Sequence, residues 1–250
     1  MIERYINNRV NAIWNDQNRF DTWKLIQEKY VETLEQLKIA EAGIAKKIRE
    51  AEVSKEEVYK QEEVTNHDLA SFVDILQKKV GEGSNWIHYG LTSSDIVDSA
   101  NSLLILQSIE IAQELILDLL KELKLKAKKN KDTKIIGRTH GVYAEETFLG
   151  NIFGNWYLEI KRSLDRVERA KVSIAYGKLS GPVGNHTVVT EEMEKITLEK
   201  LGLKPEIFAS QIVSRDRYAE VFTSLSILAS TYERISTNLR SYQRSEISEM

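Results

Sequence analysis

The sequence contains no cysteine, only two prolines and no long apolar run. Without cysteine the chain can form no disulfide, no thiolate metal site and no cysteine nucleophile, and this composition fits a reducing compartment. The apolar stretches fall short of the ~18 residues of a membrane span, and the first residues show no basic segment leading into an apolar one. We therefore expect a soluble, cytoplasmic protein that has no membrane partner.

An excess of charge of one sign is also lacking. The 35 basic and 38 acidic residues are mixed along the chain and give a net charge of −3. No basic field indicates a nucleic-acid partner, so any anionic ligand must be held by local groups. The length of 250 residues and the hydrophobic content of 42% favour one large domain with a smaller one.

The scarcity of proline favours helices. Pro182 and Pro205 both fall between periodic segments, and helix-favouring residues dominate the rest, so we predict an all-α fold. Apolar residues spaced by three and four predict a helix after Asp21, which we expect to be its N-cap. Ser54 and Glu57 have the spacing of a capping box and open a short charged helix. A further apolar stripe ends at a glycine turn over residues 81–83.

Three longer apolar stripes predict long helices. One begins near Ser94, a second follows Glu145, and a third runs from Tyr218 to Tyr242 with a heptad seam. The first of these would extend ~50 Å at 1.5 Å per residue and is too apolar to lie on a surface. Helices of this kind need partners that cover their apolar faces.

These patterns predict two domains. Residues 1–91 are expected to form a small N-terminal helical domain, and residues 92–250 a central domain built as a bundle of long helices. The sequence still reads as helix at Met250, without Gly, Asn or Pro as a stop signal. We therefore expect the bundle to be incomplete and the chain to be truncated.

All four histidines lie outside the strongly periodic segments. They are His67 in TNHD, His88 in WIHYGLTSSD, His140 in GRTHG and His186 in SGPVGNH. Loops on a rigid scaffold are where reactive groups concentrate. Taken singly, each histidine is more often structural than catalytic. Their joint placement beside Thr, Ser, Asn and Gly favours a functional site.

Hydroxyl side chains mark the start of the longest predicted helix. Thr92, Ser93 and Ser94 could bind an anion there together with free backbone N–H groups, and they could equally be plain N-caps. The glycine-rich segment 177–185 lacks the lysine placement of a phosphate loop and predicts a turn where two segments approach closely. Neither a metal-ligand spacing nor a serine-hydrolase motif occurs, so we expect no metal and no other cofactor.

Five motifs, in register over essentially the whole chain, resemble the adenylosuccinate lyase family of the fumarase and aspartase superfamily. The most specific is WIHYGLTSSDIVD at 86–98, whose HYGLTS core separates this family from the argininosuccinate, fumarate and aspartate enzymes. The others are MIERY at the start, GRTHG at 137–141, SGPVG at 180–184 and Gln-x-x-x-Arg-Asp-Arg at 211–217. The resemblance implies a bundle domain of the fumarase and aspartase type.

The resemblance also implies a reaction, a β-elimination of fumarate from succinyl-AMP and from the succinylaminoimidazole-carboxamide ribotide of purine biosynthesis. Such a reaction needs a base, stabilisation of a carbanion and an acid for the departing nitrogen. By resemblance, His140 is the general acid. The nucleotide substrate is bound by Arg4, Tyr5, Asn66, His67, Asp68, His88, Thr92, Ser93, Thr139 and Gln211. The family's assembly is a homotetramer whose active sites are shared between subunits.

The chain departs from the family pattern at several places. Position 66 is Asn where many relatives carry Arg, Tyr143 stands where some carry His, and His186 has no counterpart. The signature loop of the GSS-x-MPxK type, which supplies the catalytic base serine and a substrate-binding lysine, does not occur. We therefore expect the 250-residue chain alone to bind nucleotide weakly and to turn over negligibly.

Two alternatives stay open at this point. One is another lyase of the same superfamily, acting on an argininosuccinate or a carboxymuconate. The other is a non-catalytic helical assembly fragment, which long helices and a heptad seam would suit equally well.

Overall fold

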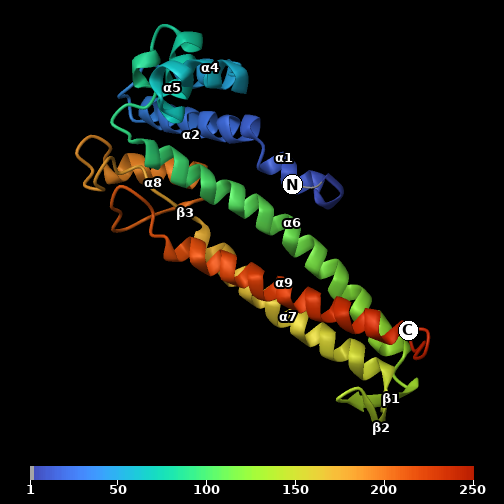
Figure 1. Ribbon diagram of the computed structural model, residues 1–250. Helices are drawn as coiled ribbons and strands as arrows, with labels where there is room; N and C mark the ends of the chain where they lie inside the picture. The colour runs from blue at the N-terminus through green and yellow to red at the C-terminus, as the bar shows by residue number, and fades with distance from the viewer. Residues whose placement is uncertain (1–2) are drawn as a thin grey trace. The chain divides into compact units, whose positions relative to one another are not determined.

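The computed structural model describes residues 3–250 and is built mainly of helices (Figure 1). In chain order, the elements are η1 (Glu3–Tyr5), α1 (Asn8–Ile13), α2 (Asp16–Gln36), α3 (Ile44–Glu50), α4 (Lys55–Thr65), α5 (Asp68–Val80), η2 (Ser84–Trp86), α6 (Ser93–Lys129), β1 (Lys134–Thr139), β2 (Val142–Phe148), α7 (Leu149–Ile174), β3 (Tyr176–Gly177), α8 (Glu191–Lys200), β4 (Lys204–Pro205) and α9 (Asp216–Tyr242). The predicted all-α class is confirmed. Met1 and Ile2, the first residues of the MIERY motif, lie outside the described residues.

The described residues form two compact units. Residues 3–108 and 174–215 belong to the first, and residues 109–173 and 216–250 to the second. The boundary between the two units lies within α6, after Ser108. The N-terminal turns of α6 belong to the first unit, and so does the segment that follows α7. The predicted division into an N-terminal domain of residues 1–91 and a bundle domain of residues 92–250 stays a prediction.

The first unit is organised around α2. Its N-cap is Asn15, whose side chain accepts a hydrogen bond from the Asn18 N–H at 2.9 Å. The prediction of Asp21 as the N-cap is therefore wrong, because a competing cap residue stands six positions earlier and Asp21 lies inside the helix. The capping box of Ser54 and Glu57 at the start of α4 is confirmed.

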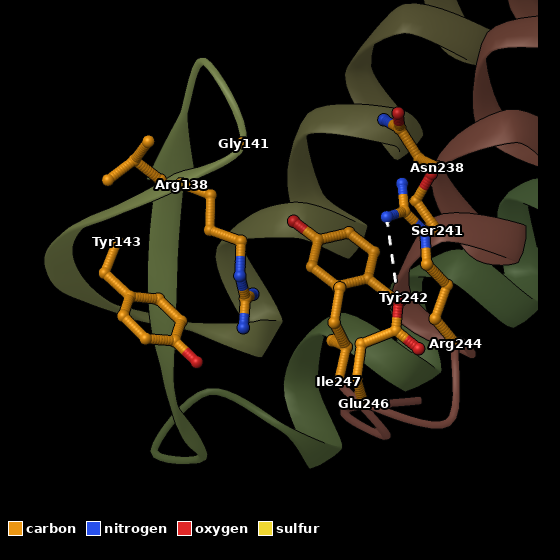
Figure 2. Close-up of a pocket in the computed structure, with 10 residues that line it drawn as sticks. Arg138, Gly141, Tyr143, Asn238, Ser241, Tyr242, Arg244, Glu246 and Ile247 are labelled. Carbon is orange, nitrogen blue, oxygen red and sulfur yellow. Dashed lines mark ion pairs between the residues drawn. The ribbon is translucent and has the colours of Figure 1, made fainter.

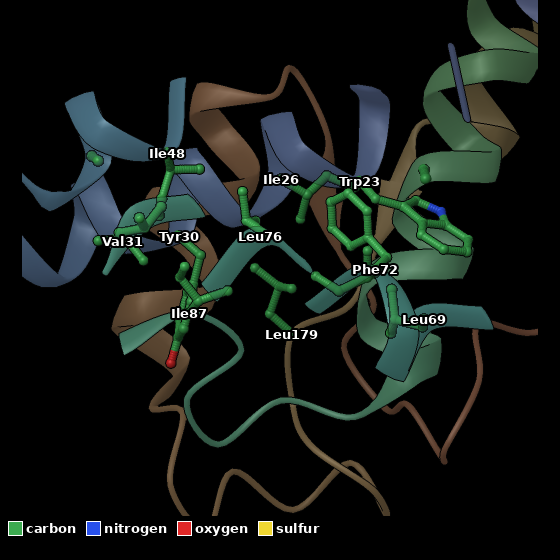
Figure 3. Packing of buried hydrophobic residues seen from close by; sticks show 14 of the residues in the cluster. Trp23, Ile26, Tyr30, Val31, Ile48, Leu69, Phe72, Leu76, Ile87 and Leu179 are labelled. Carbon is green, nitrogen blue, oxygen red and sulfur yellow. The ribbon is translucent and has the colours of Figure 1, made fainter. Parts of the chain in front are cut away.

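A continuous apolar core joins α2 to α3, α4 and α5. Figure 3 shows Trp23, Tyr30 and Phe72 among the aliphatic side chains of these helices. The rings of Trp23 and Phe72 meet edge to face, with their centroids 5.6 Å apart. Each such side chain contributes roughly 1.5–3 kcal/mol when it is fully buried, which explains how several short helices form one unit. Leu179, from the segment that follows α7, completes this core.

The second unit holds the remainder of α6 together with α7 and α9. Figure 1 shows α7 and α9 side by side, and an ion pair between Glu159 and Arg234 joins them. Lys171 links α7 to Glu110 of α6 at 3.2 Å. The predicted helix through Tyr242 is confirmed as α9. Its predicted seam is met in part, because Val221, Leu228 and Ile235 are buried, whereas Ser224 and Thr231 are buried in place of the half-buried Leu225 and Tyr232.

Two short strand pairs accompany the helices and were not part of the prediction. β1 and β2 form an antiparallel hairpin, and β3 pairs with β4 in parallel. Because β2 continues to Phe148, α7 begins at Leu149, three residues later than the sequence indicates. Most side chains of the hairpin are exposed, so it leaves no alternating apolar pattern to be recognised.

The helices of the second unit carry several exposed apolar side chains. These are Leu115, Leu117, Leu125, Leu158, Val172, Phe222 and Ile227. Within residues 3–250, no helix combines the length and the apolar character needed to cross a membrane. The expectation that the long helix would be too apolar for a surface is thus met only in part, because α6 is buried along one stripe and exposed on the opposite face.

Candidate functional site

The first candidate group lies where α4 turns into α5. Asn66 ends α4 in a left-handed conformation, with φ 53°, which asparagine tolerates better than most residues. His67 follows in an extended conformation and is the N-cap of α5. The sharp reversal at Asn66 therefore places the imidazole of His67 at the start of a helix, with the Asp68 carboxylate 3.4 Å from its Nδ1.

His67 reaches the start of α6. Its Nε2 lies 3.2 Å from the Ser93 hydroxyl, and its Nδ1 accepts the Ala70 N–H at 3.4 Å. The Ser93 hydroxyl can donate or accept this hydrogen bond, so the contact suits either state of Nε2. Two predicted binding residues that are 26 positions apart are thus brought together. Both are accessible to solvent.

His88 is held in the same unit by a buried amide. The Gln27 side chain contacts both the ring Nδ1 and the backbone N–H of His88, each at 2.9 Å. Burial, together with the charge of His67, lowers the pKa of His88 from 6.5 to about 4. The ring is therefore neutral at pH 7. Gln27 was not recognised in the sequence, although a glutamine on the apolar stripe of Trp23 and Tyr30 is a usable signal.

A buried ion pair fixes the start of α6. Lys178 and Asp95 are both fully buried and joined through the Lys178 ammonium. Asp95 also accepts the backbone N–H groups of Thr92 at 2.8 Å and Gly181 at 3.2 Å. Burial raises the pKa of Asp95, and the Lys178 charge opposes that shift. The Thr92 N–H is thus already bonded to a side chain of α6 and is not free to bind an anion. For this N–H group, the interpretation of the helix start as plain N-capping holds.

The segment that carries Gln211 is tied to the next turn of α6. Asp98, which is 2% exposed, accepts the Val213 N–H at 2.8 Å and the Arg215 guanidinium at 3.0 Å. Gln211 itself is exposed. Asp95 and Asp98 are three residues apart, so one face of α6 positions both the 178–181 segment and the Gln211 segment.

Two glycines allow close approaches of the loops around this helix start. A Cβ on Gly184, with φ 74°, would lie 2.2 Å from the Ala209 carbonyl oxygen. A Cβ on Gly90, with φ 70°, would lie 2.4 Å from a methyl carbon of Val188. The predicted close-approach turn in segment 177–185 is therefore confirmed, and a second one occurs beside His88.

Arg4 and Tyr5 form a pair of their own. The Arg4 guanidinium lies 4.9 Å from the centroid of the Tyr5 ring, and Tyr5 is 66% exposed. Within residues 3–250, neither side chain has a hydrogen bond or ion pair to His67 or Ser93. Their predicted role in nucleotide binding stays a prediction.

The predicted acid belongs to the second unit. His140 and Gly141 form the two-residue turn of the β1–β2 hairpin, with φ values of 55° and 76°. Two successive positive φ values are those of a type I′ turn, which suits tight hairpins. Thr139 pairs with Val142 across the turn, and both Thr139 and His140 are exposed. The structure thus assigns His140 and the His67–Ser93 pair to different units.

A cavity of about 890 Å³ lies beside this hairpin. Figure 2 shows Arg138 and Tyr143 on the hairpin facing Tyr242 of α9 and Arg244 and Glu246 of the tail that follows. The Arg138 guanidinium makes a bidentate ion pair with Glu249, at 2.7 and 3.1 Å, and Arg244 lies 3.9 Å from Glu246. Both arginines of the cavity therefore have carboxylate partners.

His186, for which the resemblance offered no counterpart, has a structural environment. Its Nδ1 donates to the Val189 carbonyl at 3.0 Å, and its Nε2 lies 3.7 Å from the Glu194 carboxylate. Burial raises the pKa of Glu194. Within residues 3–250, no group of three or more His, Asp or Glu side chains is arranged to hold a metal ion.

Comparison with known proteins assigns this architecture to a family. A family model described as "Lyase" matches residues 8–250. The chain belongs to this lyase family. It is 39% identical over 251 residues to the adenylosuccinate lyase of Thermotoga maritima and 37% identical over 254 residues to that of Bacillus subtilis. Each alignment covers 100% of this chain and 58% of the relative, so the chain spans less than two thirds of their length.

Solved structures show the same fold. The fumarate lyase of Mesorhizobium sp. BNC1 matches with a TM-score of 0.90 at 19% identity, covering 96% of this chain and 58% of that protein. The 3-carboxy-cis,cis-muconate lactonizing enzyme of Pseudomonas putida matches with a TM-score of 0.91 at 16% identity, covering 98% and 58%. The predicted fold type is therefore confirmed. At these identities the likeness concerns the fold alone.

Proposed function

We propose that the chain contributes substrate-binding and acid groups to an adenylosuccinate lyase, which eliminates fumarate from succinyl-AMP and from the succinylaminoimidazole-carboxamide ribotide. The observation that carries this proposal is the 39% identity over the entire chain to a relative of that name. The hydrogen bond between His67 and Ser93 supports it, because it joins two of the residues that the resemblance assigns to substrate binding.

In this proposal the first unit binds anionic oxygens. The Ser93 hydroxyl and the imidazole of His88 offer hydrogen-bond donors near the start of α6, and the imidazole of His67 contacts Ser93. A dianionic phosphate and the carboxylates of a succinyl group accept such bonds, and bonds to charged groups contribute about 1.5–3 kcal/mol each. Position 66 is Asn where many relatives carry the cation Arg, so the anionic oxygens are bound by hydroxyl and imidazole donors.

In the same proposal His140 protonates the departing nitrogen. Histidine is the side chain suited to hold and deliver a proton at neutral pH, and a hairpin tip presents it to a substrate without a competing side-chain bond. The exposed position of His140 fits a site that is completed by other chain segments. The assignment of His140 as the acid rests on the family resemblance.

A base is still required. The 250 residues contain no segment of the GSS-x-MPxK type, which the resemblance identifies as the source of the base serine and a binding lysine. The elimination cannot begin without removal of the proton beside a carboxylate. The chain by itself is therefore expected to bind the nucleotide weakly and to release a negligible amount of fumarate.

The proposed enzyme is a cytoplasmic homotetramer with shared active sites. The exposed apolar residues along α6, α7 and α9 support self-association, since long helices with uncovered apolar faces need partners. The proposal includes no nucleic-acid or membrane partner and no cofactor.

Binding measurements test this function. Isothermal titration of the 250-residue chain should detect succinyl-AMP and give an affinity about tenfold lower for Ser93→Ala, as expected from losing one bond to an anionic group. Ser230→Ala is the matched control, because its hydroxyl bonds only the Ser226 carbonyl within α9. Equal affinity for argininosuccinate would favour a different lyase of this fold, and absence of binding would contradict the proposal.

A fumarate assay provides the second test. The 250-residue chain and its His140→Ala variant should give the same negligible release from succinyl-AMP. Release above the variant would contradict the expectation that a base from the missing motif is essential.

A further inference from the structure

Gln27 makes an unusual contact from within the apolar face of α2. Its side chain has no exposed surface and lies between the core residues Ile26 and Tyr30 in the sequence. The amide oxygen accepts the backbone N–H of His88 at 2.9 Å, and the amide nitrogen lies 2.9 Å from the ring Nδ1. The oxygen and the nitrogen of this buried amide therefore both bond to His88, which is 61 positions away in the sequence.

This geometry determines the protonation of the ring. The backbone N–H of His88 can only donate, so the atom of Gln27 that meets it must be the amide oxygen. The other end of the same amide is then the NH₂ group, which also donates. Nδ1 must accept this bond, so the ring carries its proton on Nε2 and is neutral. The orientation of the amide is thus fixed by the backbone contact.

The same amide holds a strained backbone. His88 has φ 63°, in the left-handed region that residues with a Cβ seldom adopt. Gly90 follows with φ 70°, and the carbonyl of Tyr89 between them accepts the buried Tyr30 hydroxyl at 2.8 Å. Two polar side chains of α2, one turn apart, therefore fix the path of the 88–90 loop.

We propose that Gln27 is a positioning residue that holds His88 as a neutral imidazole, with its Nε2–H directed to an anionic oxygen of the ligand. The identity of that ligand rests on the proposed function. Within residues 3–250, Nε2 of His88 has no hydrogen-bond partner, which leaves this donor for a ligand. In this proposal His88 binds the ligand as a neutral hydrogen-bond donor and not as a cation.

The electrostatic surroundings agree with a neutral ring. Within residues 3–250, the titratable group that acts on His88 from a neighbouring element is His67, whose electrostatic effect disfavours a charge on the His88 ring. Burial acts in the same direction, and together they lower the pKa of His88 to about 4. Gln27 adds no charge that would stabilise the protonated form.

The experiment is nuclear magnetic resonance of the 250-residue chain with ¹⁵N-labelled histidine. The four imidazoles are assigned with His67→Gln, His88→Asn and His140→Asn variants. At pH 7 the wild type should show His88 protonated on Nε2 alone, with no titration down to pH 5. A proton on Nδ1, or a midpoint near 6.5, would overturn the proposal.

Two substitutions of Gln27 test its role directly. Gln27→Glu replaces the donor by a carboxylate, so Nδ1 should gain a proton and the midpoint of His88 should rise by about one to three pH units. Gln27→Met removes the contact with little change in volume and should give a mixture of the two neutral tautomers. An unchanged His88 signal in whichever of these variants folds would overturn the proposal.

Gln77→Met is the matched control for general loosening of the loop. The Gln77 amide donates to the carbonyls of Ser84 and Ile87, at 3.3 and 3.4 Å, and has no bond to His88. This variant should lower stability without changing the tautomer or the midpoint of His88. A change equal to that of Gln27→Met would show a merely structural role and would count against the proposal.

Addition of AMP to the same wild-type sample separates the two proposals. A shift of the His88 Nε2 signal would support Nε2 as the ligand donor. If the tautomer is as stated and AMP moves no imidazole signal, the nucleotide assignment and the ligand part of this inference fail while the positioning by Gln27 stands. If AMP shifts a ring that is protonated on Nδ1, the positioning by Gln27 fails and the nucleotide assignment stands.

Discussion

His88 and His140 occupy loops that look alike in the sequence but are held in opposite ways. Each has a left-handed backbone, with φ values of 63° and 55°, and each has a glycine nearby. His88 is bound at its ring and its backbone by the buried Gln27, whereas His140 is exposed at the tip of a two-residue hairpin turn. The first imidazole is positioned by tertiary contacts and the second by local turn geometry.

This difference extends to the surroundings of the two histidines. The first unit fixes its loops with buried polar groups, among them Lys178, Asp95 and Asp98. The cavity beside the His140 hairpin is lined by arginines whose carboxylate partners remain partly accessible. Substitutions that disturb loop anchors should therefore be severe in the first unit and mild in the second.

The largest effect is expected for Lys178→Met. It leaves Asp95 buried without its cation, which should lower the free energy of unfolding by about 3–5 kcal/mol. Urea unfolding followed by tryptophan fluorescence measures this loss, because Trp14, Trp23 and Trp86 report on the first unit and Trp156 on the second. Lys171→Met is the matched control, because its ion pair with Glu110 is solvent-exposed and should be worth less than about 1 kcal/mol. Equal losses would remove the contrast between the units.

The pH dependence of stability should also distinguish the first unit. The pKa of His88 is about 4 in the folded chain and about 6.5 when unfolded, so the unfolded state binds more protons between these values. The neutral, buried His88 therefore contributes fully to the free energy of unfolding above pH 6.5, and this contribution is lost as the pH falls toward 4. Between pH 7 and pH 4.5 this loss should amount to about 2–3 kcal/mol relative to His88→Asn, measured by urea unfolding. Parallel profiles would show that His88 is not buried as a neutral ring.

Two glycine substitutions compare the loops directly. Gly184→Ala combines a left-handed backbone with a Cβ 2.2 Å from the Ala209 carbonyl oxygen, and should destabilise by about 3 kcal/mol. Gly141→Ala has the same backbone strain but nothing within 4 Å of its Cβ, and should cost about 1 kcal/mol. Thermal unfolding gives both values. The comparison fails if the order is reversed.

The smallest effect on stability is expected for His140→Asn. Asparagine tolerates the left-handed turn and the side chain is exposed, so the free energy of unfolding should change by less than about 0.5 kcal/mol. In an enzyme that also carries the base-bearing loop, the same variant should lower fumarate release by about 10²–10⁴-fold. Full activity there would remove His140 as the acid.

The sequence predicted those features that depend on neighbouring residues. The apolar stripes identified α2, α5 and α9, the spacing of Ser54 and Glu57 identified a capping box, and the glycine turn after α5 was located. The N-cap of α2 was missed because Asn15 and Asp21 are both good caps and local propensity does not rank them. The exposed β1–β2 hairpin was missed because it lacks an apolar period.

The candidate site was predictable in composition but not in its contacts. The motifs named His67, His88 and Ser93, yet nothing local connects His67 to Ser93 or His88 to Gln27. Lys178 and Asp95 are 83 residues apart, and a lysine in a glycine-rich segment gives no sign that it will be fully buried. Pairings of this kind arise from the packing of α2, α6 and the 178–181 segment against each other, which the sequence pattern does not specify.

The most direct test is a titration of the histidine-labelled 250-residue chain with succinyl-AMP. We expect saturable shifts of the His67 and His88 imidazole signals, and much smaller shifts with the same concentration of argininosuccinate. If succinyl-AMP leaves both signals unmoved, or if argininosuccinate moves them equally, the assignment of these residues to an adenylosuccinate site is contradicted.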